Sequence, residues 1–246
     1  MTSSTQGNEN SSENEFERQQ FSASEKDKAL VTILDHLDFL RGGRPTPQMV
    51  DAKSERTQRT VERILSGARR VFTENGYGGL SLRKVAEEAE IAVGNLTYHF
   101  PNKQTLIEAM LRDSLARYIK DHLDQFHVGR DSASDILITI IRRNGVLSRK
   151  FYRFFFQTWG YAASSEQARE TVRELYRPLG KFIFHMVRAA NPSLDYIAAR
   201  RATLQYFSLE EGYKLFVGYG PTNEDAAITA EKDIEELVRE IVGLPQ

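Results

Sequence analysis

The chain has 246 residues and a mass of 28.1 kDa, enough to bury a substantial core in one large domain or two small ones. It contains no cysteine, which excludes a disulfide scaffold, thiolate catalysis and Cys-ligated zinc or iron–sulfur centres. Its net charge of −1 says little about partners until the charge is divided along the chain. No secretion signal is visible, and the longest apolar run, residues 136–141, is far shorter than the roughly 20 residues of a membrane span, so we expect a cytoplasmic protein without membrane contact.

The N-terminal extension, residues 1–54, has three parts. Residues 1–23 are rich in Ser, Asn, Gln and Glu and almost without apolar side chains, which predicts disorder. Ser24 can cap an amphipathic helix over residues 24–40. Residues 44–47 contain two prolines, which favour an extended linker.

From about residue 55 the spacing of apolar residues is helical throughout, and no stretch alternates as a strand would. The expected helices are a first helix that ends at Asn75 and Gly76, two short helices over 81–89 and 93–100, a long helix capped by Asn102, and stretches at 133–147, 149–162, 165–190, 195–217 and 223–242. The sequence therefore predicts an all-α fold. We expect two domains, a smaller one over 55–103 and a larger helical one over 104–246.

The two short helices are joined by only three residues, 90–92, which is the spacing of a helix-turn-helix that places its second helix in the major groove. Leu96 and Phe100 would anchor this second helix in the core. The surrounding stretch, residues 44–103, carries 10 Lys and Arg against 7 Asp and Glu, so the basic excess of the chain lies here.

The remaining positions of the second helix suit contact with DNA. Gly94 allows a close approach of the backbone, and Asn95 can bind an adenine edge or a phosphate. Hydroxyl and imidazole donors to phosphate oxygens follow at Thr97, Tyr98 and His99. Lys103 begins the next helix, where its ammonium adds to the attraction of the helix N-terminus for phosphate.

Residues 57–111, and above all GYGGLSLRKVA (76–86) and VGNLTYHFPNK (93–103), closely resemble the DNA-binding domain of the TetR family of bacterial transcriptional regulators. The resemblance covers about a quarter of the chain. It implies DNA contacts from Ser81, Arg83, Val93, Gly94, Asn95, Thr97, Tyr98, His99 and Lys103. Two positions depart from the family pattern: Glu90 stands where the turn usually has Gly, and Thr97 stands where the family often has Tyr.

An aromatic cluster at residues 151–161 holds more rings than one helix face can bury. These rings form either a packed core or dimer contact, or the lining of a pocket for a small apolar or aromatic effector. The pocket interpretation names Phe151, Tyr152, Phe155, Trp159, His185 and Tyr206.

The leading hypothesis is a homodimeric, ligand-responsive repressor on a pseudo-palindromic operator. Residues 55–103 would form the DNA-binding domain. Residues 104–246 would form the effector-binding and dimerisation domain, with the dimer contact at residues 195–217 and 223–242. The alternative is a DNA-binding regulator controlled by a protein partner that grips helix 24–40 or the aromatic cluster, with no small-molecule inducer. The histidines lack metal-ligand spacing, and no phosphate loop or nucleophile elbow is present. We therefore expect no catalytic residue, metal or cofactor.

A further hypothesis concerns Arg41 and Arg44, which flank two glycines ahead of Pro45. This segment resembles the core of AT-hook segments, with one extra glycine. It could lie in a narrow minor groove of A·T-rich DNA, where negative potential attracts arginine. The alternative is a basic linker without a DNA contact.

Overall fold

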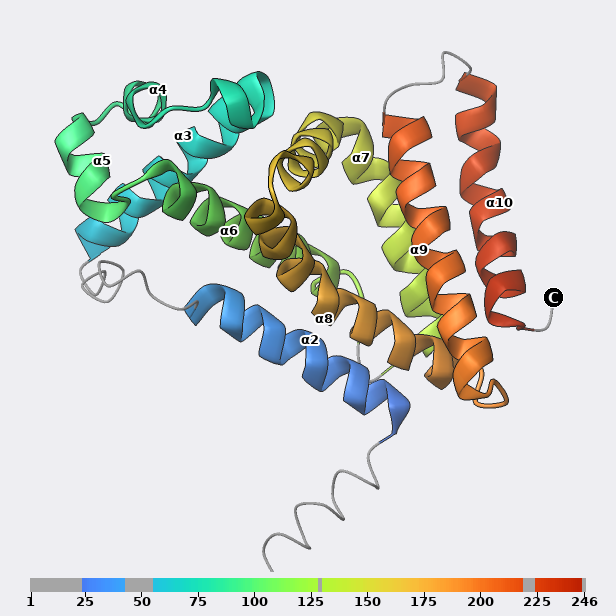
Figure 1. Ribbon diagram of the computed structural model, residues 1–246. Coiled ribbons are helices and arrows are strands. Elements are labelled where there is room, and N and C mark those ends of the chain that lie inside the picture. Colours follow the sequence, from blue (N-terminus) through green and yellow to red (C-terminus); the bar gives the residue numbers. More distant parts are fainter. Residues whose placement is uncertain (1–23, 43–54, 128–129, 219–223, 245–246) are drawn as a thin grey trace, which may run out of the picture.

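The computed structural model describes residues 24–42, 55–127, 130–218 and 224–244 (Figure 1). These residues form nine α-helices and no strand: α2 (Glu25–Gly42), α3 (Glu55–Gly79), α4 (Leu82–Glu88), α5 (Val93–His99), α6 (Lys103–Leu123), α7 (Ala133–Ser164), α8 (Glu166–Ala190), α9 (Tyr196–Gly218) and α10 (Glu224–Val242). The predicted all-α fold is confirmed. No helix of this described part is long and apolar enough to cross a bilayer.

Three of the sequence predictions concern residues that the structure does not fully describe. The predicted disorder of residues 1–23 and the predicted linker at 44–47 lie outside the described residues. The structure describes neither Arg44 nor the side chain of Arg41, so the minor-groove arm stays a prediction.

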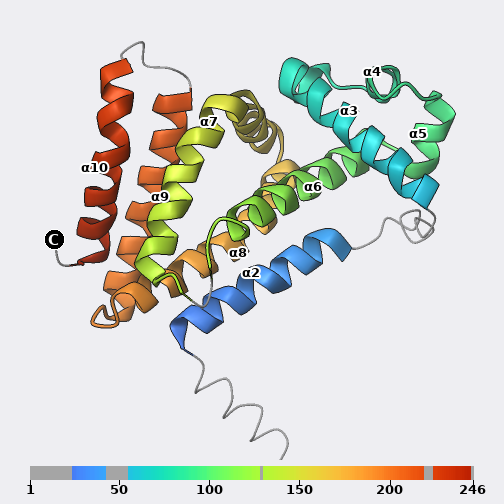
Figure 2. The same ribbon diagram turned by 180° about the vertical axis from the view of Figure 1, so that it is seen from behind.

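Helices α3, α4 and α5 pack with the start of α6 into a small bundle at one end of the molecule (Figures 1 and 2). Helix α3 forms because its apolar residues, such as Ile64, Ala68 and Phe72, recur at helical spacing and are fully buried. At Gly76 the backbone turns with a φ of 66°, a left-handed conformation that glycine adopts without steric cost. A Cβ here would also lie 2.4 Å from Oε1 of Gln157 on α7, so this bundle touches the rest of the protein closely.

Helix α7 is one continuous helix, so the predicted division into 133–147 and 149–162 was wrong. Ser132 and Asp135 start it with a reciprocal capping box. Residues 147–149 contain neither glycine nor proline to stop it. Gly145 lies inside the helix, where a Cβ would meet the ring of Tyr213 at 2.2 Å, so here the small residue permits close packing of α9.

Helix α2 lies alongside α8 and α6, away from the small bundle that follows it in sequence (Figures 1 and 2). Its apolar face is buried against these helices: Ala29, Leu30, Ile33, Leu37 and Leu40. Two polar contacts also join α2 to α8. His36 Nε2 lies 3.1 Å from the Leu175 carbonyl oxygen, and His185 Nδ1 lies 2.7 Å from Glu25 Oε2. Most of the apolar face of the predicted helix 24–40 is therefore covered within the chain, whereas Val31, Leu34 and Phe39 remain exposed.

Helices α9 and α10 stand beside α7 at the other end of the molecule (Figure 1). Their inner faces are buried, with Ala199, Tyr206 and Val238 almost inaccessible. Large apolar side chains also point to solvent, including Ile197 and Leu204, each 69% exposed. Helix α9 therefore carries apolar side chains, beside the exposed Arg200 and Arg201, that nothing in the described part of the chain covers.

Candidate nucleic-acid interface and adjoining cavity

Helices α4 and α5 form a tight two-helix unit. Ser81 caps α4, its hydroxyl accepting a hydrogen bond from the Lys84 backbone N–H at 3.3 Å. The turn between the helices is closed by hydrogen bonds from the Ile91 N–H to the Ala86 carbonyl and from the Leu96 N–H to the Ala92 carbonyl. The short turn predicted at residues 90–92 is confirmed.

Glu90 occupies the turn with a φ of 51°, the only positive value of a non-glycine residue in the described part. A side chain in this conformation costs about 1–2 kcal/mol relative to glycine. Arg63 of α3 donates hydrogen bonds to the carbonyl oxygens of Ala89 and Glu90 at 2.8 and 3.1 Å. The turn is thus held by α3 in a conformation that its own residue disfavours.

Helix α5 presents a polar, accessible outer face because Leu96 and Phe100 are fully buried beneath it. Most of the predicted DNA-contact residues are exposed: Ser81, Arg83, Val93, Gly94, Asn95 and Tyr98. Tyr98 is 59% exposed, the largest accessible ring of this helix. Thr97 is half-buried, and its hydroxyl donates to the Gly94 carbonyl at 3.1 Å. The six exposed residues are therefore accessible, and their DNA contacts stay predictions.

His99 and Lys103 lie differently from the others. His99 is only 5% exposed, its Nδ1 has no hydrogen-bond partner among the described residues, and burial lowers its pKa, so the imidazole is neutral. Lys103 Nζ donates to the Tyr77 carbonyl and lies 4.1 Å from the Tyr77 ring centroid, and burial lowers its pKa. Both side chains are held by the protein, and their DNA contacts stay predictions.

A cavity of about 780 Å³ lies between α3, α6, α7, α8 and α9. Its wall is mainly aromatic and aliphatic, with Phe151, Phe154 and Phe155 of α7 facing Tyr176 of α8 and Phe207 of α9. A volume of this size suits a drug-sized molecule. The cavity can therefore hold an organic ligand of mostly apolar character.

The structure brings together only part of the predicted pocket set. Phe151 and Phe155 line the cavity, whereas the other four residues do not: Tyr152, Trp159, His185 and Tyr206. Trp159 is 47% exposed and packs on Tyr176, with ring centroids 5.8 Å apart. His185 contacts Glu25 of α2, and the buried Tyr206 donates its hydroxyl to the Leu137 carbonyl at 2.8 Å.

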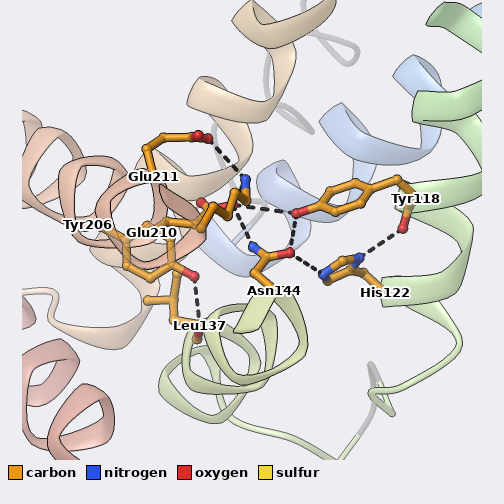
Figure 3. A network of polar contacts seen from close by, with 8 residues as sticks. Tyr118, His122, Leu137, Asn144, Tyr206, Glu210 and Glu211 are labelled. Atoms are coloured by element: carbon orange, nitrogen blue, oxygen red, sulfur yellow. Dashed lines mark hydrogen bonds and ion pairs between the residues drawn. The ribbon is translucent and has the colours of Figure 1, made fainter. Parts of the chain in front are cut away.

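Sequence reasoning missed a network of polar contacts (Figure 3). Three of its α9 residues line the cavity, and the part that they line is called the inner end below: Glu210, Glu211 and Lys214. The buried Lys214 ammonium lies 2.7 Å from Glu210 Oε1 and 3.0 Å from Glu211 Oε1. Asn144 donates to Glu210 at 2.5 Å and accepts from the Tyr118 hydroxyl. Burial alone would lower the pKa of Lys214, but the charge of Glu210, with smaller effects from other neighbours, raises it well above its usual value. The lysine is therefore charged within the core.

The small bundle supplies part of the cavity wall, through five side chains of α3: Ser66, Arg69, Arg70, Thr73 and Glu74. The same helix contacts α7 through Phe72 and Phe154, whose ring centroids are 5.8 Å apart. The sequence-based division gave the effector pocket to residues 104–246 alone. A molecule in the cavity would instead touch the first helix of the bundle directly.

Residues of the small bundle are similar to a known protein family. Residues 64–110 match the sequence profile of the tetR family of bacterial regulatory proteins. The chain is 36% identical over 63 residues to the HTH-type transcriptional regulator UidR of Escherichia coli K12, which covers 26% of this chain and only 32% of UidR.

Two solved structures share the fold over most of both chains. FadR of Bacillus subtilis in complex with stearoyl-CoA has a TM-score of 0.61 at 17% identity and covers 72% of this chain and 96% of FadR. A regulator of Saccharomonospora viridis in complex with choline has a TM-score of 0.61 at 18% identity and covers 74% of this chain and 96% of that one. At such identities the likeness concerns the fold alone.

Proposed function

Because the chain belongs, through residues 64–110, to the tetR family of bacterial regulatory proteins, we propose that it is a sequence-specific DNA-binding transcriptional regulator. The observation that supports this most is the outer face of α5, where Asn95 and Tyr98 are exposed on a helix anchored by buried Leu96 and Phe100. Side chains at these positions would bind base edges and phosphates in the major groove.

The regulator would act as a homodimer. The exposed apolar side chains of α9, with Ile197 and Leu204 at its outer face and Leu237 on neighbouring α10, offer a surface that a second copy would bury. A two-fold interface of this kind presents two α5 helices to successive major grooves of a pseudo-palindromic operator. Repression follows if the operator overlaps a promoter.

Release of DNA would follow occupation of the cavity. Since α3 supplies Arg69, Thr73 and Glu74 to the wall, a ligand can favour one position of the DNA-binding bundle over another. A difference of a few kcal/mol in ligand affinity between the two positions is enough to shift DNA binding. The solved structures with stearoyl-CoA and choline support the proposal that the cavity binds a ligand. Because these two ligands carry opposite charges, the ligand class for this chain has to be argued from the residues of its own cavity wall.

One observation favours this function over control by a protein partner. The cavity supports an effector. A partner would have to bind the side of helix 24–40 away from α6 and α8, or the exposed side chains of the aromatic cluster, such as Trp159. A non-enzymatic, cytoplasmic regulator without a cofactor is part of the same proposal.

The test is DNA binding by the full chain. A duplex is first selected by the wild-type protein from a random pool, and its affinity is then measured at fixed salt for a variant that combines Asn95→Ala, Tyr98→Ala and Lys103→Ala. Each lost contact should cost about 1–3 kcal/mol of binding, and loss of the lysine should reduce the salt slope by about one. A control with the exposed α8 changes Gln167→Ala and Lys181→Ala should bind as wild type. Wild-type affinity of the triple variant would remove α5 from the interface.

A further inference from the structure

The inner end of the cavity carries an excess of buried negative charge. Glu210 and Glu211 both contact the single ammonium of Lys214, so two carboxylates share one cation (Figure 3). The side chains of Glu210 and Lys214 are 6% and 8% exposed, and that of Glu211 is 28% exposed toward the cavity that it lines. If both carboxylates are ionised, this end of the cavity holds one negative charge that no protein cation balances.

Glu211 has hydrogen-bonding capacity to spare. Among the described residues its only hydrogen-bond partner is Lys214, which Oε1 accepts. Its second oxygen, Oε2, accepts no hydrogen bond from the described residues. Burial, opposed by the charge of Lys214 and supported by that of Glu210, raises the pKa of Glu211, which shows that the protein alone stabilises this carboxylate poorly.

Aromatic rings surround the same end. The Lys214 ammonium lies 5.2 Å from the centroid of the Phe155 ring and 5.8 Å from that of Tyr118. Tyr176 and Phe207 complete the aromatic wall. The faces of such rings are electronegative and attract cations. The inner end therefore already holds one ammonium by the combination of carboxylates and rings.

The arginines of the wall each contact a carboxylate of the protein. Arg143 binds Asp121 through two nitrogens, and Arg70 binds Glu88. Arg69 and Arg117 share Asp113, which leaves a positive excess there, but the Arg117 side chain is 60% exposed, so water screens its charge. Lys150 is exposed, 5.3 Å from the ring centroid of Phe151. The more deeply buried excess of charge is thus negative, at the inner end.

We propose that this cavity takes an amphipathic organic amine, whose cationic head lies at the inner end with Glu211 as its counter-ion. The proposal rests on the effector role proposed above and names the ligand class. A cation would bring the inner end to two positive and two negative charges. A carboxylate ligand would bring three negative charges against Lys214 alone, in a site where unpaired charge is costly. The phenylalanines and leucines of the wall would cover the apolar body of the ligand.

The test uses three probes that share one apolar body and differ only in the head group: 4-(biphenyl-4-yl)butylammonium, the corresponding alcohol and the corresponding carboxylate. Their affinities for the full chain are measured by calorimetry without DNA. The ammonium should bind about tenfold more tightly than the alcohol, and the carboxylate should bind weakest. A carboxylate that binds as tightly as the ammonium, or an ammonium that does not bind, would overturn the proposal.

Glu211→Gln should weaken binding of the ammonium probe about tenfold and leave the alcohol unchanged. The matched control is Glu74→Gln, which removes an exposed carboxylate from the same wall and should leave the affinity within about twofold. Equal effects of the two changes would exclude Glu211 as counter-ion. The ranking of the probes on wild-type protein needs no variant, so it stands even if Glu211→Gln fails to fold. A chain that binds the ammonium but no DNA would refute the proposed function and leave this inference intact.

Discussion

Replacing Gly94 by alanine should stabilise the protein and weaken its binding to DNA at the same time. Gly94 is the second residue of α5, it is exposed, and an added Cβ would have no neighbour within 4 Å. In the free protein the methyl group therefore meets open space. Alanine in a helix loses less backbone entropy on folding, which raises the free energy of unfolding by about 0.4–1 kcal/mol. For a chain of this length that corresponds to a melting temperature about 1–4 °C higher.

The effect on DNA should have the opposite sign. If the backbone at Gly94 lies against the groove, the methyl group overpacks the interface, at a cost of about 1–3 kcal/mol. The dissociation constant for a selected duplex should then rise about 5- to 150-fold at fixed salt. Thermal denaturation and a fluorescence-anisotropy titration of the same preparation measure the two effects. Gly160→Ala is the matched control, because Gly160 is also an exposed helical glycine with nothing within 4 Å of its added Cβ, but lies on α7. The reasoning fails if Gly94→Ala is more stable yet binds DNA like the control.

The other predictions concern the turn, the dimer and helix α2. Glu90→Gly should relieve the positive φ and raise the free energy of unfolding by about 0.5–1 kcal/mol after the entropy of glycine is subtracted, seen as a higher melting temperature; Glu90→Ala should not, and equal stability of the two variants would rule out backbone strain. Leu204→Glu should convert a dimer into a monomer in sedimentation velocity, and an unchanged dimer would place the interface away from α9. Burial raises the pKa of Glu25, but hydrogen bonds from His185 and Lys28 and the charge of Arg188 outweigh it and lower the pKa below 4.5. Its stabilising contribution is therefore present above pH 4.5 and lost as the pH falls below that value, so the melting temperatures of wild type and Glu25→Gln should converge in acid; a constant difference would contradict this.

Local sequence signals predicted the helix-turn-helix well because they act within a few residues. The cap at Asn102 is present as expected, and α4 begins directly after Ser81, where a short helix was predicted to start. The expected stop at Gly76 is a kink with non-helical dihedral angles, after which α3 continues to Gly79. The same rules, followed further, would have placed His99 inside the domain, since it shares a helix face with Leu96 three positions earlier. The burial of His99 could therefore have been predicted from the spacing of the residues.

Helical spacing also divides the aromatic cluster. Phe151, Phe154, Phe155 and Thr158 recur at intervals of three and four and together line the cavity. Tyr152 and Trp159 are seven apart and lie on another face. This division could have been predicted.

The inner end of the cavity could not be predicted in the same way. Asn144, Tyr118 and Glu210 lie on three different helices and meet in one network. Helix α3 contributes to the cavity wall from another part of the chain. These contacts depend on how helices far apart in sequence pack together. The local signal was the spacing of Glu210 and Lys214, which are four residues apart on one helix and can form an ion pair.

The most direct measurement of the central claim is the anisotropy of a labelled, selected duplex bound to the wild-type chain, followed while the ammonium probe is added. Trp159, the single tryptophan, packs on cavity-lining Tyr176 and reports occupancy of the cavity in the same sample through its fluorescence. The account predicts that anisotropy falls to that of free duplex as the cavity fills, and that the carboxylate probe at equal concentration has no effect. A complex that stays intact while the tryptophan signal shows a filled cavity would contradict the proposed coupling.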